Sequence, residues 1–323
     1  MNVLIAGGSG QVGTILARAF HADRHEVIVL SRTPHAAPWR SLQWDAQTLG
    51  SWVSDLERAD VVINLAGRSV NCRYNAANRR IIWESRVRST QIIGRAMAQC
   101  ARPPRVWLQA STATIYAYRV DAPNDETTGI IGGAELDVPD TWRFSVDVAK
   151  AWEEAAQAAV TPHTRLVLMR SAMIMSPDRG GIFDTLLALV RKGLGGISDD
   201  GRQFVSWIRD QDIIRAVRWL IDHEELAGPI NIASPNPIPN ADFMRSLRAA
   251  WGIKWGLPAT RWMLEIGALL MRTETDLVLK SRRVIPRRLL ESGYVFEFPM
   301  WNEAATDLCR RLRSPAHEGL SKA

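Results

Sequence analysis

The stretch NVLIAGGSGQVG, residues 2–13, decides the fold. It begins as an apolar run of strand length and continues into QVGTILARAFHA, whose apolar residues recur at helical spacing. Glycines in a turn between a strand and a helix let backbone N–H groups and the helix N-terminus approach a pyrophosphate. The Gly-x-x-Gly-x-x-Gly spacing therefore predicts a dinucleotide site, with a purely structural turn as the alternative. The predicted contacts are Gly7, Ser9, Gly10, Gln11, Val12 and Gly13.

Four more apolar, β-branched runs of strand length follow: HEVIVLSR, ADVVINLAG, RVWLQAS and TRLVLMRSA. Long helical patterns, notably residues 75–101 and 144–160, separate them. Strands that are apolar throughout are typical of parallel sheets covered by helices on both faces. The sequence therefore predicts an α/β fold, a Rossmann-type doubly wound parallel sheet with a smaller, mostly helical C-terminal lobe.

The alternation of strands and helices weakens after Arg170. DQDIIRAVRWLID then predicts a helix and GPINIAS one more strand. We expect a dinucleotide-binding Rossmann domain made of residues 1–170 and 207–234. Residues 171–206 and 235–323 are expected to form the smaller lobe, which would hold the substrate.

Composition and charge exclude several classes of protein. The 323 residues are 46% hydrophobic and 23% charged, and the three cysteines have neither paired nor metal-ligand spacing, which favours a reducing cytosol. The net charge of +6 includes basic clusters late in the chain, but no nucleic-acid motif accompanies them, so a solvated basic face is expected. WMLEIGALLM, residues 262–271, is shorter than the roughly 20 residues of a membrane span and predicts a core helix. We expect a cytoplasmic protein without a signal peptide, a metal site, a membrane span or a nucleic-acid partner, with a loose tail at residues 314–323.

The end of the second predicted strand indicates which dinucleotide binds. An NAD site often has Asp or Glu there, about 20 residues after the glycines, to accept from the ribose 2′-OH. Here Ser31 and Arg32 occupy the position. A guanidinium cannot accept a hydrogen bond but pairs well with a phosphate, and a serine hydroxyl can donate to one. NADP is therefore favoured over NAD, with a surface role for Arg32 as the alternative.

Two further segments are candidates for the adenosine end of the cofactor. NLAG follows a predicted strand, and its small residues Leu65, Ala66 and Gly67 form a turn that can pass beneath an adenosine. Asp45 either accepts from the adenine amino group or caps the next helix. The sequence does not decide between these two roles.

Together these motifs resemble a known family. The glycine spacing, NLAG, ASTATIY and the lysine at 150 are similar to extended short-chain dehydrogenases/reductases of the nucleotide-sugar epimerase type. WESRVRST, AKAWEEAAQ, RSAMIMSPDRGG and GPINIASPNPIPNADF resemble the atypical branch usually called "epimerase family protein", over essentially the whole chain. The resemblance implies that Ala110 and the main chain at Ser171 approach the cofactor. It also implies that Arg86 helps to hold the phosphates, with a solvated helix face as the alternative.

The same resemblance assigns the catalytic positions. In short-chain reductases a Ser or Thr holds the substrate oxygen, a Tyr transfers the proton, and a Lys four residues later binds the nicotinamide ribose and lowers the tyrosine pKa. The first role falls on Thr112, beside Ser111, and the last on Lys150. The tyrosine position is occupied by Val146, which cannot transfer a proton.

Tyr116 and Tyr118 are the candidate replacements, because they lie just beyond Thr112; alternatively, one packs into the core and the other onto the surface. The family places its substrate cleft near GRQFVSWI. The side chains that would line it are Arg202, Gln203, Trp207 and Arg209. Such a cleft suits a flat or anionic small molecule.

The sequence is compatible with two functions. The first is an NADP-dependent oxidoreductase or epimerase that acts on a small molecule, and the second is a non-catalytic NADP(H)-binding sensor or scaffold. Both are compatible with a monomer or a homodimer.

Overall fold

The computed structural model describes residues 1–259 and 280–314. The core helix predicted at residues 262–271 lies outside the described residues, and so does the predicted tail from residue 315 on. Within the described part of the chain, no helix is both long and apolar enough to span a membrane.

The described chain divides into two compact units. The first comprises residues 1–115, 133–171 and 214–230, and the second residues 116–132, 172–213 and the described residues from 231 on. Residues 116–132, which we expected in the dinucleotide-binding domain, thus group with the second unit. They do so because they pair with the C-terminal segment: the N–H of Asn124 donates to the carbonyl of Arg283 at 2.7 Å, and the N–H of Ile285 donates to the carbonyl of Asn124 at 3.0 Å.

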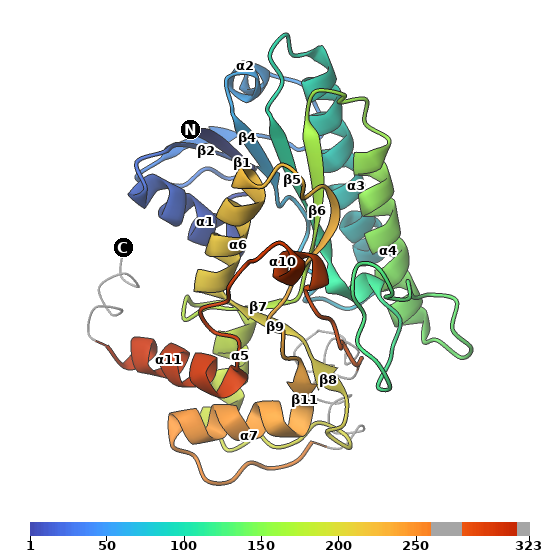
Figure 1. Ribbon diagram of the computed structural model, residues 1–323, viewed down its shortest axis with the longest axis vertical. Coiled ribbons are helices and arrows are strands. Elements are labelled where there is room, and N and C mark those ends of the chain that lie inside the picture. The colour runs from blue at the N-terminus through green and yellow to red at the C-terminus, as the bar shows by residue number, and fades with distance from the viewer. Residues whose placement is uncertain (260–279, 315–323) are drawn as a thin grey trace. The chain divides into compact units, whose positions relative to one another are not determined.

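The first unit is built on a seven-stranded sheet in the order β10-β6-β5-β4-β1-β2-β3 (Figure 1). All neighbouring pairs from β6 to β3 are parallel. The strands are β1 (Asn2–Ala6), β2 (Glu26–Ser31), β3 (Arg40–Gln43), β4 (Val61–Asn64), β5 (Val106–Thr112), β6 (Arg165–Ser171) and β10 (Gly228–Ile232). The predicted Rossmann-type sheet is confirmed.

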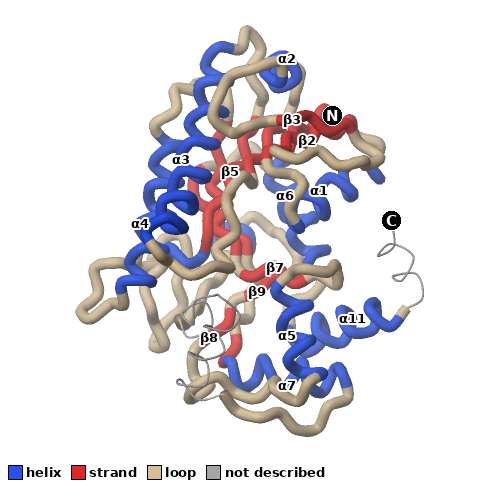
Figure 2. Tube along the Cα trace, turned by 180° about the vertical axis from the view of Figure 1, so that it is seen from behind, coloured by secondary structure: helices blue, strands red, loops and turns tan. Residues whose placement is uncertain are grey.

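Helices cover both faces of this sheet. They are α1 (Gln11–Ala22), α2 (Trp52–Glu57), α3 (Ala76–Gln99), α4 (Asp140–Gln157) and α6 (Asp210–Asp222). Figures 1 and 2 show α3 and α4 side by side on one face, and α1 and α6 on the other. The side chain of Asn75 caps α3 by accepting from the N–H of Asn78 at 2.8 Å. Helix α4 begins one turn earlier than the predicted residue 144, directly after Pro139, whose fixed φ suits a helix entry.

The order of the strands fixes where a ligand can bind. From β1 the chain adds β2 and β3 on one side and β4, β5 and β6 on the other. The connections after β1 and β4 therefore leave the sheet in opposite directions, which opens a crevice at the carboxyl ends of these two strands. The glycine turn at residues 7–13 and the NLAG turn at residues 64–67 lie at this point.

The second unit has more of its described residues in helices than in strands, and its C-terminal region is helical, as predicted. Its elements are β7 (Met173–Met175), α5 (Ile182–Arg191), β8 (Phe204–Val205), β9 (Trp207–Arg209), β11 (Ile238–Pro239), α7 (Asn240–Trp251), α10 (Arg287–Glu291) and α11 (Trp301–Arg313). Trp301 joins the core by stacking on Phe243, with ring centroids 4.1 Å apart, and by contacting Trp207 at 5.0 Å. The last described helix is thus part of the core of this unit.

Candidate functional site

A pocket of about 470 Å³ opens at the carboxyl edge of the sheet in the first unit. Its wall is formed by residues that follow β1, β2, β3 and β4, together with one face of α3. Nine of the predicted cofactor residues line it: Gly7, Ser9, Gly10, Ser31, Arg32, Asp45, Leu65, Ala66 and Gly67. The structure thus brings together four segments that are far apart in the sequence.

The glycine turn is shaped by close approaches of the backbone. A Cβ atom on Gly7, whose φ is +72°, would lie 2.7 Å from the main chain of Ala66, and one on Gly13 would lie 2.4 Å from Cα of Gly8. Gly10 differs, because a Cβ there would meet only the carbonyl of Gly7, at 3.6 Å. The space beside Gly10 is therefore left open by the protein and is available to a ligand.

Helix α1 begins next to this space. Its N-cap is Gly10, which has no side chain to cap the first N–H groups, and its first turn contains no acidic residue. The exposed N–H groups and the helix dipole favour an anion at this end. Gln11 and Val12 belong to this first turn, so they can contribute main-chain donors, although they do not line the pocket. The arrangement fits a pyrophosphate.

Ser31 lines the pocket, and its hydroxyl is bonded within the protein. Its hydroxyl donates to Ser9 Oγ at 2.8 Å or to the carbonyl of Thr33 at 3.0 Å, and accepts from the N–H of Thr33 at 3.2 Å. These bonds occupy the hydroxyl of Ser31, which is 5% exposed, and tie the end of β2 to the glycine turn. When Ser31 donates to Ser9, the hydroxyl of Ser9 keeps its own proton for a ligand.

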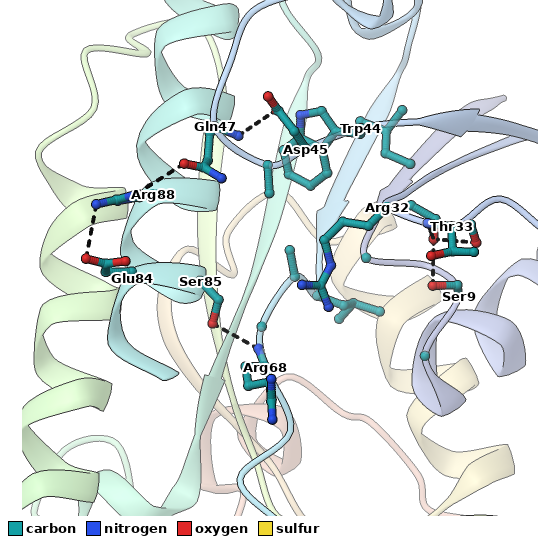
Figure 3. Close-up of a pocket in the computed structure, with 18 of the residues that line it drawn as sticks. Ser9, Arg32, Thr33, Trp44, Asp45, Gln47, Arg68, Glu84, Ser85 and Arg88 are labelled. Atoms are coloured by element: carbon teal, nitrogen blue, oxygen red, sulfur yellow. Dashed lines mark hydrogen bonds and ion pairs between the residues drawn. The ribbon is translucent and has the colours of Figure 1, made fainter. Parts of the chain in front are cut away.

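Arg32 enters the pocket from the end of β2 (Figure 3). Its guanidinium has no hydrogen bond or ion pair with any other residue that the structure describes. No carboxylate stands at the end of β2 to accept from a ribose 2′-OH. An exposed, unpaired guanidinium at this position fits a phosphate on that hydroxyl.

Asp45 lies at the pocket but is already satisfied. Its carboxylate accepts from the N–H groups of Gln47 and Thr48 at 2.8 and 2.9 Å, and from the Thr48 hydroxyl at 2.7 Å. The bonds from Thr48 lower the pKa of Asp45, so it remains ionised. The sequence left two roles open for Asp45, adenine binding and helix capping. The structure favours a capping role, although Asp45 caps a turn before α2 and not the helix itself.

Arg86 is bonded to the main chain of the protein, and its predicted contact with the phosphates stays a prediction. It does not line the pocket, and its Nη1 donates to the carbonyls of Arg68 and Ile82 at 3.0 and 3.1 Å. Its guanidinium lies 5.0 Å from the ring of Trp152 on α4 and packs against Gly67. Burial lowers the pKa of Arg86 to about 10. Arg86 therefore stabilises the turn that follows β4, through its hydrogen bond to the main chain of Arg68.

Ser111 and Thr112 are adjacent at the end of β5, but their hydroxyl groups have different hydrogen-bond partners. Ser111 donates to Glu153 at 2.5 Å, and Glu153 forms a bidentate pair with Arg170 at 2.8 Å on both oxygens. All three are less than 9% exposed. Thr112 is half-buried, and its Oγ1 only accepts from the N–H of Thr114 at 3.2 Å, which leaves its proton for another acceptor. Thr112 rather than Ser111 is therefore available to a substrate oxygen.

Lys150 and Val146 lie one turn apart on the same face of α4. The Lys150 ammonium has no partner among the described residues, as expected of a group that binds a ligand. Val146 is 1% exposed, and a Cβ on Gly133 would lie 3.3 Å from its side chain and 3.6 Å from Lys150 Nζ. The loop at Gly133 thus covers the position where the family has its tyrosine.

The predicted replacements for that tyrosine both lie in the second unit. Tyr116 is 2% exposed, and its hydroxyl donates to Oδ1 of Asn231 at 2.9 Å. Tyr118 is 40% exposed, and burial together with the charges of Asp200 and Asp199 raises its pKa, which disfavours the phenolate. One tyrosine packs into the core and the other lies on the surface, which was the alternative interpretation.

Of the four residues expected in the substrate cleft, Gln203, Trp207 and Arg209 are buried, and Arg202 is exposed. Trp207 and Arg209 are both fully buried in the second unit. Arg209 pairs with Asp210 and Asp307, and its guanidinium lies 4.9 Å from the ring of Phe298. Burial lowers its pKa, while the hydrogen bond to Asp307 opposes this shift. These side chains hold α11 in place rather than lining a cleft.

Several residues that line the pocket were not predicted from the sequence, among them Thr33, His35, Trp44, Gln47, Arg68 and Ser85. Trp44 and Gln47 lie close to the predicted Asp45, in the segment that follows β3. Arg68 directly follows NLAG, so its position next to a predicted cofactor turn was a usable signal.

The covered position of Val146 leads to a prediction. Val146→Tyr should destabilise the protein by about 1–3 kcal/mol, because the phenol would overpack the space under Gly133. We expect a lower melting temperature and no new NADPH-dependent carbonyl reduction. Phe144→Tyr, which adds a hydroxyl to a half-buried ring on the same helix, is the control and should melt like the wild type. An unchanged melting temperature for Val146→Tyr would contradict this prediction and would show that the loop at Gly133 moves to accommodate the phenol.

Comparison with known protein families gives two matches. The model of the NAD dependent epimerase/dehydratase family matches residues 3–233. That of a domain of unknown function, DUF1731, matches residues 259–308.

Individual relatives agree with these matches. Epimerase family protein SDR39U1 of Bos taurus is 32% identical over 303 residues, which are 93% of this chain and 96% of the relative. The crystal structure of human epimerase family protein SDR39U1 (isoform 2) with NADPH superimposes with a TM-score of 0.83 at 29% identity, covering 97% of this chain and 100% of that one. A nucleoside-diphosphate sugar epimerase from Corynebacterium glutamicum gives a TM-score of 0.74 at 27% identity, covering 99% of this chain but 60% of that one. The resemblance to epimerase family proteins is confirmed.

Proposed function

The chain belongs to the NAD dependent epimerase/dehydratase family, and from this premise we propose that it is an NADP(H)-dependent, epimerase-like oxidoreductase acting on a small molecule. The observation that carries the proposal is the pocket with an open glycine turn and the unpaired Arg32. The human relative whose structure contains NADPH supports the choice of cofactor.

The cofactor-binding roles follow from the geometry of the first unit. The turn around Gly10 and the first N–H groups of α1 would hold the pyrophosphate. Arg32 would pair with the 2′-phosphate, and the unpaired ammonium of Lys150 would bind the hydroxyls of the nicotinamide ribose. The main chain at Ala110 and Ser171, at the ends of the neighbouring strands β5 and β6, would approach the nicotinamide.

In the reaction, bound NADPH would supply a hydride to a carbonyl carbon of the substrate. The hydroxyl of Thr112 would donate to the carbonyl oxygen, where negative charge develops. The proton that completes the alcohol would come from water or from an unassigned group, because the side chain of Val146 has no ionisable group to donate one. Ser111 would take no part in the reaction, because its hydroxyl donates to Glu153.

Two alanine substitutions test the assignment of Thr112. Thr112→Ala should reduce kcat/KM for NADPH-dependent reduction of a carbonyl substrate by about tenfold or more, since one hydrogen bond to the developing oxyanion is lost. Its melting temperature should not change. The matched control Ser111→Ala should lower the melting temperature instead, because it removes a hydroxyl from the buried group around Glu153. Turnover that survives in Thr112→Ala would remove this residue from the mechanism.

A second candidate function is favoured by Val146. Its burial beneath Gly133 supports a protein that binds NADPH without hydride transfer, as a sensor or scaffold. This candidate predicts tight NADPH binding but no turnover of any substrate in a panel of aldehydes and ketones. It also predicts a cofactor-dependent change in conformation, detectable as altered protease sensitivity. Measured turnover would reject it.

A further inference from the structure

We propose that Arg68 is a specificity-determining residue, which together with Arg32 binds the 2′-phosphate of NADP(H). The inference rests on the proposed function, because it assigns a second residue to the same pocket. Figure 3 shows both side chains in this pocket, Arg32 coming from the end of β2 and Arg68 from the turn after β4.

The first argument is that both guanidinium groups lack partners. Neither Arg32 nor Arg68 forms a side-chain hydrogen bond or ion pair with any described residue. Several other arginines of the unit do pair: Arg40 with Asp55 at 2.7 Å, Arg218 with Asp23 at 2.5 Å, and Arg88, the third arginine that lines this pocket, with Glu84 at 3.1 Å. Two cations that share a pocket without a counter-ion indicate an anionic ligand.

The second argument is that the backbone of Arg68 is fixed on both sides. Its N–H donates to Oγ of Ser85 at 2.9 Å, and its carbonyl accepts from Nη1 of Arg86 at 3.0 Å. Arg86 is held in turn by the carbonyl of Ile82 and by Trp152. A surface loop residue anchored in this way presents its side chain at a defined place, so a ligand needs to order only that side chain.

The third argument concerns which phosphate is bound. The pyrophosphate already has donors in the glycine turn and the first N–H groups of α1. A phosphate monoester carries about two negative charges at neutral pH and three acceptor oxygens, which is enough for two guanidinium forks. With Arg32 alone, much of that charge would stay uncompensated. The remaining carboxylates at the pocket do not compete, because Glu84 pairs with Arg88 and Asp45 is bonded within its own turn.

Ligand titrations of the full-length protein test the inference. Arg68→Ala should raise the Kd for NADPH by about 20-fold and the Kd for NADH by less than about threefold, as expected for a lost charge-assisted bond to a group that NADH lacks. Adenosine 2′,5′-bisphosphate, which carries the 2′-phosphate without the nicotinamide, should be weakened like NADPH. The matched control is Arg102→Ala, an exposed arginine just before β5 at the opposite edge of the sheet, which should change neither constant.

The outcomes distinguish this inference from the proposed function. Equal weakening of NADPH and NADH by Arg68→Ala would place Arg68 on the pyrophosphate and overturn the inference, and so would unchanged binding of both. In either case a wild type that prefers NADPH, and loses the preference in an Arg32 variant, would leave the proposed function intact. A wild type that binds NADH as tightly as NADPH would instead remove the proposed cofactor and the inference together.

Discussion

Arg32→Asp should weaken NADPH binding by about 300-fold, or about 3.4 kcal/mol, while the Kd for NADH changes by less than about threefold. The guanidinium has no competing partner among the described residues, so its interaction energy is available to the 2′-phosphate. The substitution removes a charge-assisted hydrogen bond and places a carboxylate against a dianion. A carboxylate at this position can also accept from the 2′-OH of NADH, which offsets losses for that cofactor.

The measurement is a fluorescence titration of both nucleotides at two salt concentrations. Arg102→Asp applies the same change of charge at the opposite edge of the sheet and controls for long-range electrostatics. Arg32→Asp should reverse the preference of the protein, whereas Arg102→Asp should keep it. Equal losses for NADPH and NADH would mean that Arg32 does not contact the 2′-phosphate.

Gly13→Ala should destabilise the protein by about 3 kcal/mol, whereas Gly10→Ala should leave its stability unchanged. The new Cβ at Gly13 would lie 2.4 Å from the backbone of Gly8, which cannot move like a flexible side chain. At Gly10 the φ of −74° suits any residue, and the nearest atom to a Cβ is 3.6 Å away. The methyl group at Gly10 would, however, occupy the open space above the turn.

Thermal melts and titrations of the two variants separate these effects. Gly13→Ala should melt about 6–12 °C lower, from a shift of about 2–4 °C per kcal/mol. Gly10→Ala should melt like the wild type but bind NADPH and NADH about 30-fold more weakly, because both carry the pyrophosphate. If Gly10→Ala bound both nucleotides normally, the pyrophosphate would have to lie elsewhere.

The strands and helices that were predicted correctly are those that a local pattern of apolar residues determines. The buried β-branched runs and the helical pattern from Asp210 to Asp222 correspond to the elements found. Strand β3 was missed because its residues, RSLQ, are polar or half-exposed, as an edge strand allows. The grouping of residues 116–132 with the second unit depends on main-chain pairing with residues distant in sequence, which no local pattern records.

The residues of the candidate site also fall into two groups, those that the local sequence predicts and those whose roles depend on contacts made in the folded chain. Residues of the glycine turn, with Arg32 and Leu65 to Gly67, were found because they follow strands, and the carboxyl ends of parallel strands meet at one edge. The roles of Asp45 and Arg86 could not be predicted, since each depends on which groups fold against it. The same holds for Tyr116, whose phenol is occupied by Asn231, 115 residues away in the chain.

The position of α11 has a consequence for how this family is divided. The family model of the epimerase region ends at residue 233 and that of DUF1731 begins at residue 259, yet Trp301 stacks on Phe243 and Asp307 pairs with the buried Arg209. A protein truncated at the border between the two models would leave Arg209 as a buried cation without Asp307 and would expose Trp207 to water. Residues 280–308 of the segment of unknown function therefore share one hydrophobic core with residues that the epimerase model matches, so the two segments are expected to fold together.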